Sequence, residues 1–172
     1  MSASVLVTYA TNCGSTQEVA EAVAAELRTG GFTAELQPMR SVKTLNGYHA
    51  VILGAPLYIG HWHKDTRRFL MYYEKALKER PVAVFALGPL HDDEKEWRDV
   101  RAQFAQELAK FPWLKPVAIE VMGGCFNPAK LRFPFNLAPL LRQTPASDIR
   151  DWPSIRAWAS TLATKFQPVL VS

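Results

Sequence analysis

The sequence predicts an α/β domain in which a parallel β-sheet is covered by helices on both faces. Short apolar runs bounded by Gly or Pro recur along the chain, as strands buried on both faces should. Between them, apolar residues repeat every three or four positions, which is the period of a helix. Strand and helix alternate about five times, which favours parallel strands joined by helical crossovers. The 172 residues fit one domain, which we expect to span 1–172.

The strands are expected in two kinds. Phe32, Ala34 and Leu36 alternate with polar residues, so this segment is predicted to be an edge strand with one wet face. The remaining strands are apolar on both faces and are predicted to be fully buried. They read Val5-Leu6-Val7, Val51-Ile52-Leu53, Val82-Ala83-Val84-Phe85 and Val117-Ala118-Ile119.

The first helix is predicted to begin near Ser15 and to end at Gly30-Gly31, a typical C-terminal cap. Ser15 and Glu18 have the spacing of a capping box, in which each side chain accepts a hydrogen bond from the other residue's backbone N–H. The later helices are expected around three apolar repeats: Phe69, Tyr73 and Leu77; Trp97, Val100, Phe104 and Leu108; and Ile155, Trp158, Ala159 and Leu162.

Ligands of parallel sheets bind beyond the carboxyl ends of the strands, where the order of the strands reverses. We therefore expect the ligand site in four loops, residues 10–16, 54–64, 87–92 and 122–128. Residues 123–150 form a long connection that holds four prolines and many apolar residues. Connections of this length are usually functional or disordered, and the apolar content argues against simple disorder.

Composition limits the class of protein. Hydrophobic residues make up 48% and charged residues 21%, which is typical of a globular chain. No apolar run approaches the roughly 20 residues that cross a bilayer, and the N-terminus lacks a basic region, so we interpret the protein as cytoplasmic. The net charge of +4 fits an anionic partner or merely a slightly basic surface. Cys13 and Cys125 match no metal spacing.

The stretch "YATNCGST", residues 9–16, has three interpretations. It is a simple helix cap, a cysteine active site, or a cradle for phosphate. A phosphatase with Cys13 as nucleophile would need Arg six positions later, where Val19 stands. A phosphate cradle needs backbone N–H groups at a helix N-terminus, hydroxyl donors and a Gly that lets the backbone approach, and all of these are present. The absence of Lys suits a tightly held monophosphate.

"TNCGST" resembles the phosphate loop of the flavodoxin family, Thr/Ser-x-Thr-Gly-x-Thr, which holds the phosphate of FMN. The resemblance implies a three-layer flavodoxin-like sandwich with a five-stranded parallel sheet in the order 2-1-3-4-5. It also implies FMN as the cofactor. The implied phosphate-binding residues are Thr11, Asn12, Cys13, Gly14, Ser15 and Thr16, with Cys13 replacing the usual Thr as a weaker donor.

The same resemblance assigns two further loops to the flavin ring. In "GAPLYIGHWHKD", Gly60 is the candidate hinge whose peptide faces the reactive N5, and Pro56, Leu57, Tyr58 and Ile59 would line the ring. In "ALGPLHDD", flavodoxins usually place a stacking Tyr, whereas this chain has Gly88, Pro89 and Leu90. His61 and His63 flank Trp62, but no third ligand has useful spacing, so we expect no metal.

The wider stretch "YATNCGSTQEVAEAVAAEL" is similar to the branch that includes menaquinone-dependent protoporphyrinogen IX dehydrogenase. In that branch, Gly-Gly after the last strand precedes a long insertion, and the match here is Gly123-Gly124 and the segment through Leu141. Basic residues beside Phe and Leu at 130–142 suit a contact with a membrane surface or a greasy anionic substrate. The alternative is that these apolar residues only cover the core.

The sequence is compatible with two functions. The first is an FMN oxidoreductase of the protoporphyrinogen dehydrogenase type that acts on a quinone or a porphyrinogen. The second is an electron-transfer protein that shuttles electrons between redox partners. We expect no nucleic-acid partner, and we assign no catalytic acid or base. A signalling receiver is excluded because the third strand continues as "AVILGAPL" without the Asp that would be phosphorylated.

Overall fold

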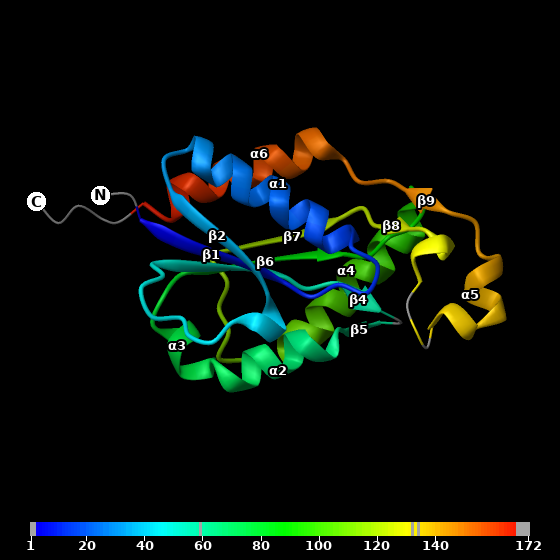
Figure 1. The fold of residues 1–172 in the computed structure, drawn as a ribbon, viewed down its shortest axis with the longest axis horizontal. Helices are drawn as coiled ribbons and strands as arrows, with labels where there is room; N and C mark the ends of the chain where they lie inside the picture. Colours follow the sequence, from blue (N-terminus) through cyan, green and yellow to red (C-terminus); the bar gives the residue numbers. More distant parts are fainter. Residues whose placement is uncertain (1–2, 59, 132, 134, 168–172) are drawn as a thin grey trace, which may run out of the picture.

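Five parallel strands form the central sheet of the computed structural model, which describes residues 3–58, 60–131, 133 and 135–167 (Figure 1). The order β2-β1-β3-β6-β7 confirms the predicted order 2-1-3-4-5, since the short strands β4 and β5 pair outside this sheet. The strands are β1 (Ser4–Tyr9), β2 (Thr33–Pro38), β3 (Ala50–Gly54), β6 (Val82–Leu87) and β7 (Ala118–Met122).

Helices cover both faces of the sheet (Figure 1). Val5 and Val7 of β1 pack in one core and Leu6 between them packs in the other, as the period of two requires. One core is covered by α1 (Ser15–Thr29) and α6 (Trp152–Lys165). The other is covered by α2 (Lys64–Tyr72), α3 (Glu74–Lys78) and α4 (Glu94–Ala109).

The segment predicted around Phe69, Tyr73 and Leu77 folds as two helices, α2 and α3, which are separated at Tyr73. The hydroxyl of Tyr73 donates to the backbone oxygen of Val42, 2.8 Å away. Val42 follows the 3₁₀ helix η1 (Met39–Ser41), so this bond joins the break between the helices to the connection between β2 and β3.

The predicted capping box at Ser15 is wrong. Gly14 is the N-cap of α1, its φ of 87° lies in the left-handed region, and no side chain caps the helix. The carboxylate of Glu18 instead binds Arg150, with 2.7 Å between Oε2 and Nη1. A guanidinium from the far end of the chain thus replaces the local partner that the spacing suggested.

The prediction that Val117-Ala118-Ile119 is fully buried is also wrong. β7 lies at the edge of the sheet, and Val117 and Ile119 are 41% and 51% exposed. The run is as apolar as those of the central strands, so its pattern could not distinguish an edge position. The alternating segment, β2, does form the opposite edge, with Ala34 buried and Thr33 and Glu35 exposed.

The long connection carries short elements of its own beyond the sheet (Figure 1). Strands β8 (Cys125–Phe126) and β9 (Ser147–Asp148) pair antiparallel and close the base of this segment. Between them lie η2 (Pro128–Lys130), η3 (Phe135–Leu137) and α5 (Pro139–Gln143). Within the described residues, no helix is long and apolar enough to cross a membrane.

Candidate functional site

A pocket of about 740 Å³ lies beyond the carboxyl ends of the strands. All four loops that the sequence singled out contribute to it, as expected at the point where the strand order reverses. Its lining includes Asn12, Cys13, Ser15, Thr16, Pro56, Leu57, Tyr58, Gly60, Gly88 and Leu90 among the predicted site residues. Thr11, Gly14 and Pro89 do not line it, and Ile59 lies outside the described residues.

Thr11 and Gly14 shape the first loop instead of facing the pocket. The hydroxyl of Thr11 accepts a hydrogen bond of 2.8 Å from the N–H of Gly14. The left-handed conformation of Gly14 then starts α1, in whose first turn the N–H of Glu18 donates to the oxygen of Gly14. Glycine is the residue best suited to this conformation because it has no Cβ.

Thr16 is the most informative donor in the first loop. Its side chain is fully buried and lines the pocket, yet its Oγ1 has no hydrogen-bond partner among the described residues. A buried hydroxyl without a partner costs free energy, so its position at the wall of a pocket points to a ligand that accepts a hydrogen bond from it.

The first two loops are held together by hydrogen bonds. The N–H of Asn12 donates to the hydroxyl of Tyr58, 3.1 Å away, and Nε2 of His63 lies 2.9 Å from Oδ1 of Asn12. Nδ1 of His63 accepts a hydrogen bond from the N–H of Asp65 and thereby caps α2. Nε2 therefore carries the ring proton and donates a hydrogen bond to Oδ1 of Asn12. Burial raises the pKa of Tyr58 to about 12 and lowers that of His63, keeping both side chains neutral.

The second loop is a hairpin made of β4 (Leu57–Tyr58) and β5 (His61–Trp62). Gly60 has a φ of 77°, as its turn requires. The nearly buried carboxylate of Glu107, on α4, anchors the hairpin by accepting the N–H of Trp62 at 3.2 Å. Burial raises the pKa of Glu107, but hydrogen bonds from Lys110, Trp62 and His61 outweigh it and hold the pKa below its usual range.

The third loop is closely packed around glycines. A Cβ on Gly88 would lie 2.2 Å from Cγ1 of Val100, so no larger residue fits this backbone position. The N–H of Gly124 donates to the oxygen of Pro89, which fastens the third loop to the fourth. Leu90 contributes an aliphatic side chain to the lining of the pocket.

The two histidines that flank Trp62 contact different side chains. The ring of His61 is exposed and contacts Glu107, whereas the ring of His63 is nearly buried and contacts Asn12. Within the part of the chain that the structure describes, no group of three His, Cys, Asp or Glu side chains could hold a metal ion.

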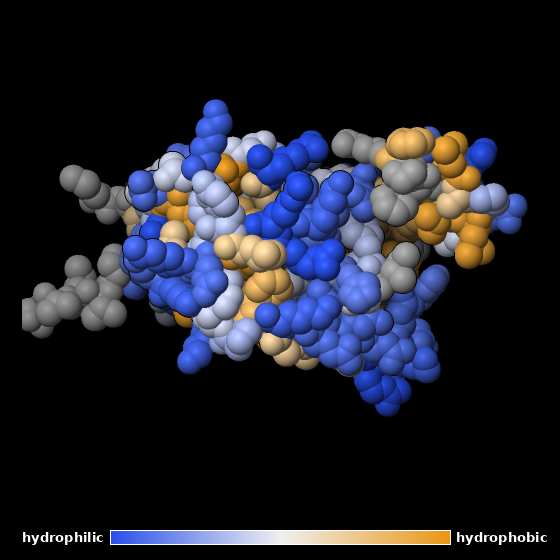
Figure 2. Space-filling view, turned by 90° about the horizontal axis from the view of Figure 1, so that it is seen from below, coloured by the Kyte–Doolittle hydropathy of each residue, from blue (hydrophilic) through white to orange (hydrophobic). Residues whose placement is uncertain are grey.

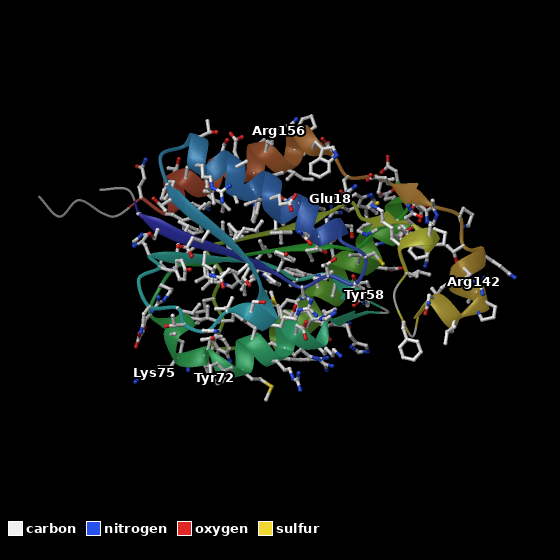
Figure 3. All side chains as sticks on the ribbon, viewed as in Figure 1. Glu18, Tyr58, Tyr72, Lys75, Arg142 and Arg156 are labelled. Atoms are coloured by element: carbon white, nitrogen blue, oxygen red, sulfur yellow. The ribbon has the colours of Figure 1, made fainter. Side chains whose placement is uncertain are left out.

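Several lining residues were missed by sequence reasoning. One face of α4 contributes Glu96, Asp99, Val100 and Gln103, whose spacing of three or four was a usable signal for a shared face. The long connection, which the sequence already singled out as a candidate contact for substrate or membrane, contributes Cys125, Phe126, Leu131 and Leu141. In Figure 3, Tyr58 lies among the loops at the strand ends, with the α5 segment and Arg142 beyond it.

The chain belongs to the flavodoxin domain family, whose model matches residues 6–134. This defines it as a member of an FMN-binding oxidoreductase family. It is 24% identical over 131 residues to protoporphyrinogen IX dehydrogenase [quinone] of Escherichia coli K12, covering 74% of this chain and 72% of that protein.

Solved structures share the fold. An archaeal flavodoxin superposes with a TM-score of 0.57 at 13% identity and covers 95% of this chain and 98% of its own. Oxidised flavodoxin 1 from Bacillus cereus gives 0.58 at 15% identity, covering 95% and 97%. A point mutant of the flavo di-iron protein from Thermotoga maritima gives 0.61 at 18% identity, and the match spans 97% of this chain but only 37% of that one.

The pocket fits the cofactor that the family indicates, FMN. The unpartnered hydroxyl of Thr16 stands at the N-terminus of α1, where backbone N–H groups and the helix dipole favour a negative charge. Apolar side chains, among them Leu57, Leu90 and Leu131, also line the pocket and offer surfaces suited to a flat ring.

Proposed function

We propose that this protein is an FMN-dependent oxidoreductase of the quinone-dependent protoporphyrinogen IX dehydrogenase type. When bound, FMN supplies the redox chemistry, and the protein supplies binding, orientation and exclusion of water. The relative from Escherichia coli supports this choice, and the apolar residues that line part of the pocket support a lipophilic substrate.

The first loop would hold the phosphate of FMN through the N-terminus of α1 and the hydroxyls of Ser15 and Thr16. Tyr58 and His63 would fix Asn12, and through it the first loop, by the hydrogen bonds described above. Leu57, Gly60 and Leu90 would face the ring, with Gly88 keeping the third loop close to α4. Ile59, which the structure does not describe, remains a proposed ring contact from the sequence.

The single observation that carries the proposal is the wall that the long connection adds to the pocket. Phe126, Leu131 and Leu141 come from this connection and line the same pocket as the first loop. The connection therefore contributes an apolar surface where a lipophilic quinone or porphyrinogen would approach the cofactor.

The outer side of the same connection supports a peripheral contact with a membrane. Phe133, Leu137 and Leu140 are 77%, 63% and 78% exposed, and Lys130 and Arg142 lie in the same segment. In Figure 2, the end of the molecule where α5 lies is largely hydrophobic. Apolar side chains flanked by cations suit the surface of an anionic bilayer, from which a lipophilic substrate could enter the pocket.

The test measures oxidation of protoporphyrinogen IX by a soluble menaquinone analogue in detergent, using the FMN-loaded protein. We expect turnover by the natural sequence and a roughly tenfold lower kcat/KM for Leu131→Ala/Leu141→Ala, because each truncation removes apolar surface that would contact the proposed substrate. FMN affinity, titrated in parallel, shows whether the loss arises from the cofactor.

Leu137→Ser/Leu140→Ser is the matched control, since both residues belong to the same segment but point to solvent. This variant should turn over normally in detergent and bind anionic vesicles less well than the natural sequence. Absence of turnover by the FMN-loaded natural sequence would contradict the enzyme and favour an electron-transfer protein. Equal turnover of the Leu131/Leu141 variant would remove the connection from substrate handling.

A further inference from the structure

The positive charge of the chain is concentrated in one stretch. Residues 40–80 contain eight Lys or Arg and three Asp or Glu, whereas the remainder contains 12 and 13. The stretch therefore carries a net charge of +5, more than the +4 of the whole molecule. The excess of positive charge is therefore local to residues 40–80 and is not spread evenly over the chain.

Two of the three acidic side chains of the stretch form ion pairs within it. Glu74 and Glu79 lie 2.6 Å and 3.9 Å from Lys78 and Arg80, whereas Asp65 lies beside the unprotonated Nδ1 of the neutral His63. The six remaining cations are exposed, and none forms a salt bridge with a described residue. They are Arg40, Lys43, Lys64, Arg67, Arg68 and Lys75.

Three of these cations line one groove on the side of α2 and α3. The groove, of about 610 Å³, lies between η1 and α2, and Arg40, Lys43 and Arg68 line it together with Asp65, Tyr72 and Tyr73. Figure 2 views this side of the molecule and shows a mainly hydrophilic face with a small hydrophobic area. We call Arg40, Lys43, Lys64, Arg67, Arg68, Lys75 and Tyr72 the basic face.

The side chains of the basic face favour a protein partner. Tyr72 is 79% exposed and the adjoining Met71 is 73% exposed, and Figure 3 shows Tyr72 and Lys75 on the outer side of their helices. Arg, Tyr and Met are the residue types enriched at protein interfaces, and a concave groove accepts a protruding carboxylate. The outer side of the long connection, with Phe and Leu on a projecting segment, has the different character suited to lipid.

The basic face also adjoins the cofactor pocket. Lys64 follows His63, and the imidazole of His63 contacts Asn12 of the first loop. We propose that the basic face docks an acidic redox protein, whose carboxylates pair with Arg40 and Arg68 and whose redox centre is brought to the edge of the pocket. Complementary charge of this kind steers encounter and fixes orientation. This inference does not depend on which small molecule the enzyme oxidises.

The experiment uses the FMN-loaded protein and a bacterial ferredoxin, a small acidic redox protein, as the probe. Affinity is measured by biolayer interferometry at about 20 mM and about 200 mM NaCl, a range over which exposed charges become screened. We expect binding at low salt, at least tenfold weaker binding at high salt, and at least tenfold weaker binding by Arg40→Glu/Arg68→Glu at low salt. Arg40→Gln/Arg68→Gln should give an intermediate affinity.

Lys115→Glu/Arg156→Glu is the control, because it changes the net charge equally at exposed positions outside residues 40–80. It should retain most of the affinity, and thermal unfolding should show every variant folded. If both Glu variants lost affinity for ferredoxin equally, net charge alone would explain the effect and the proposed docking face would be wrong. Absence of ferredoxin binding at low salt would also overturn it. The proposal would likewise be overturned if the Arg40→Glu/Arg68→Glu variant lost affinity for anionic vesicles or a DNA duplex but not for ferredoxin.

Discussion

Three threonines bury hydroxyls that have no partner among the described residues: Thr8, Thr16 and Thr66. Of these three, Thr16 alone lines the pocket. A ligand in the pocket could therefore satisfy the hydroxyl of Thr16 but not those of Thr8 and Thr66. Substitution of Thr16 is therefore the most direct test of the proposed phosphate site in the first loop.

We expect Thr16→Val to weaken FMN binding about tenfold, because a hydrogen bond to a charged phosphate contributes roughly 1.5–3 kcal/mol and part of it is recovered by neighbouring donors. Quenching of FMN fluorescence on titration measures the affinity. Thr66→Val removes an equivalent hydroxyl away from the pocket and should leave the affinity unchanged. Equal affinities of Thr16→Val and the natural sequence would show that the hydroxyl does not bind the cofactor.

At the scale of elements, His63 joins a helix cap to a loop. Its Nδ1 caps α2 and its Nε2 holds Asn12, an arrangement that only the neutral ring makes. Burial lowers the pKa of His63, and the charges of Lys64 and Arg40 act in the same direction, while Asp65 opposes them. The ordinary value in an unfolded chain is about 6.5, so the unfolded chain takes up this proton first as the pH falls.

The free energy of unfolding should therefore decrease as the pH falls from about 6.5 towards the lower pKa of the folded protein. His63→Asn retains a capping acceptor but has no titrating ring. We expect the loss of stability between about pH 7.5 and pH 5.5 to be smaller in His63→Asn. Denaturation by urea at the two pH values measures it, and an equal loss in both proteins would assign the effect to other groups.

At the scale of the whole molecule, Arg150 connects the long connection to the first helix. Its nearly buried guanidinium binds Asp148 and Glu18, donates to the backbone oxygen of Ser15 at 3.4 Å, and lies 4.9 Å from the ring centroid of Trp152. The residue that fastens the wall of the pocket thus also contacts the first loop. Glu18 is labelled on α1 in Figure 3.

We expect Arg150→Gln to lower the free energy of unfolding by about 1 kcal/mol, because it removes the hydrogen bonds of a nearly buried guanidinium, while solvent partly screens the half-exposed carboxylates of Glu18 and Asp148. Release of the connection should also speed cleavage by trypsin after Lys130 and Arg142. Arg156→Gln, at an exposed position of α6, is the control and should change neither quantity. Unchanged proteolysis of Arg150→Gln would show that other contacts hold the segment.

Much of the sheet and several site loops could be predicted from the sequence, because each depends on neighbours within a few positions. Val5, Leu6 and Val7 alternate between two cores, and Gly30 and Asp151 end and begin helices where local chemistry suits them. The capping box failed because Glu18 found a partner 132 residues away. The edge position of Ile119 was equally hidden, because apolar composition does not report which strands lie beside it.

The sequence by itself determined the alternation of strands and helices, the polar first loop and the excess of cations in residues 40–80. These follow from residue type and spacing alone. Only the tertiary structure decided that Tyr58 binds Asn12, that Leu131 and Leu141 form a wall of the pocket, and that Arg40 and Arg68 line one groove. The physical reason is that such contacts join segments tens of residues apart, whose meeting depends on how the whole sheet and its covering helices pack.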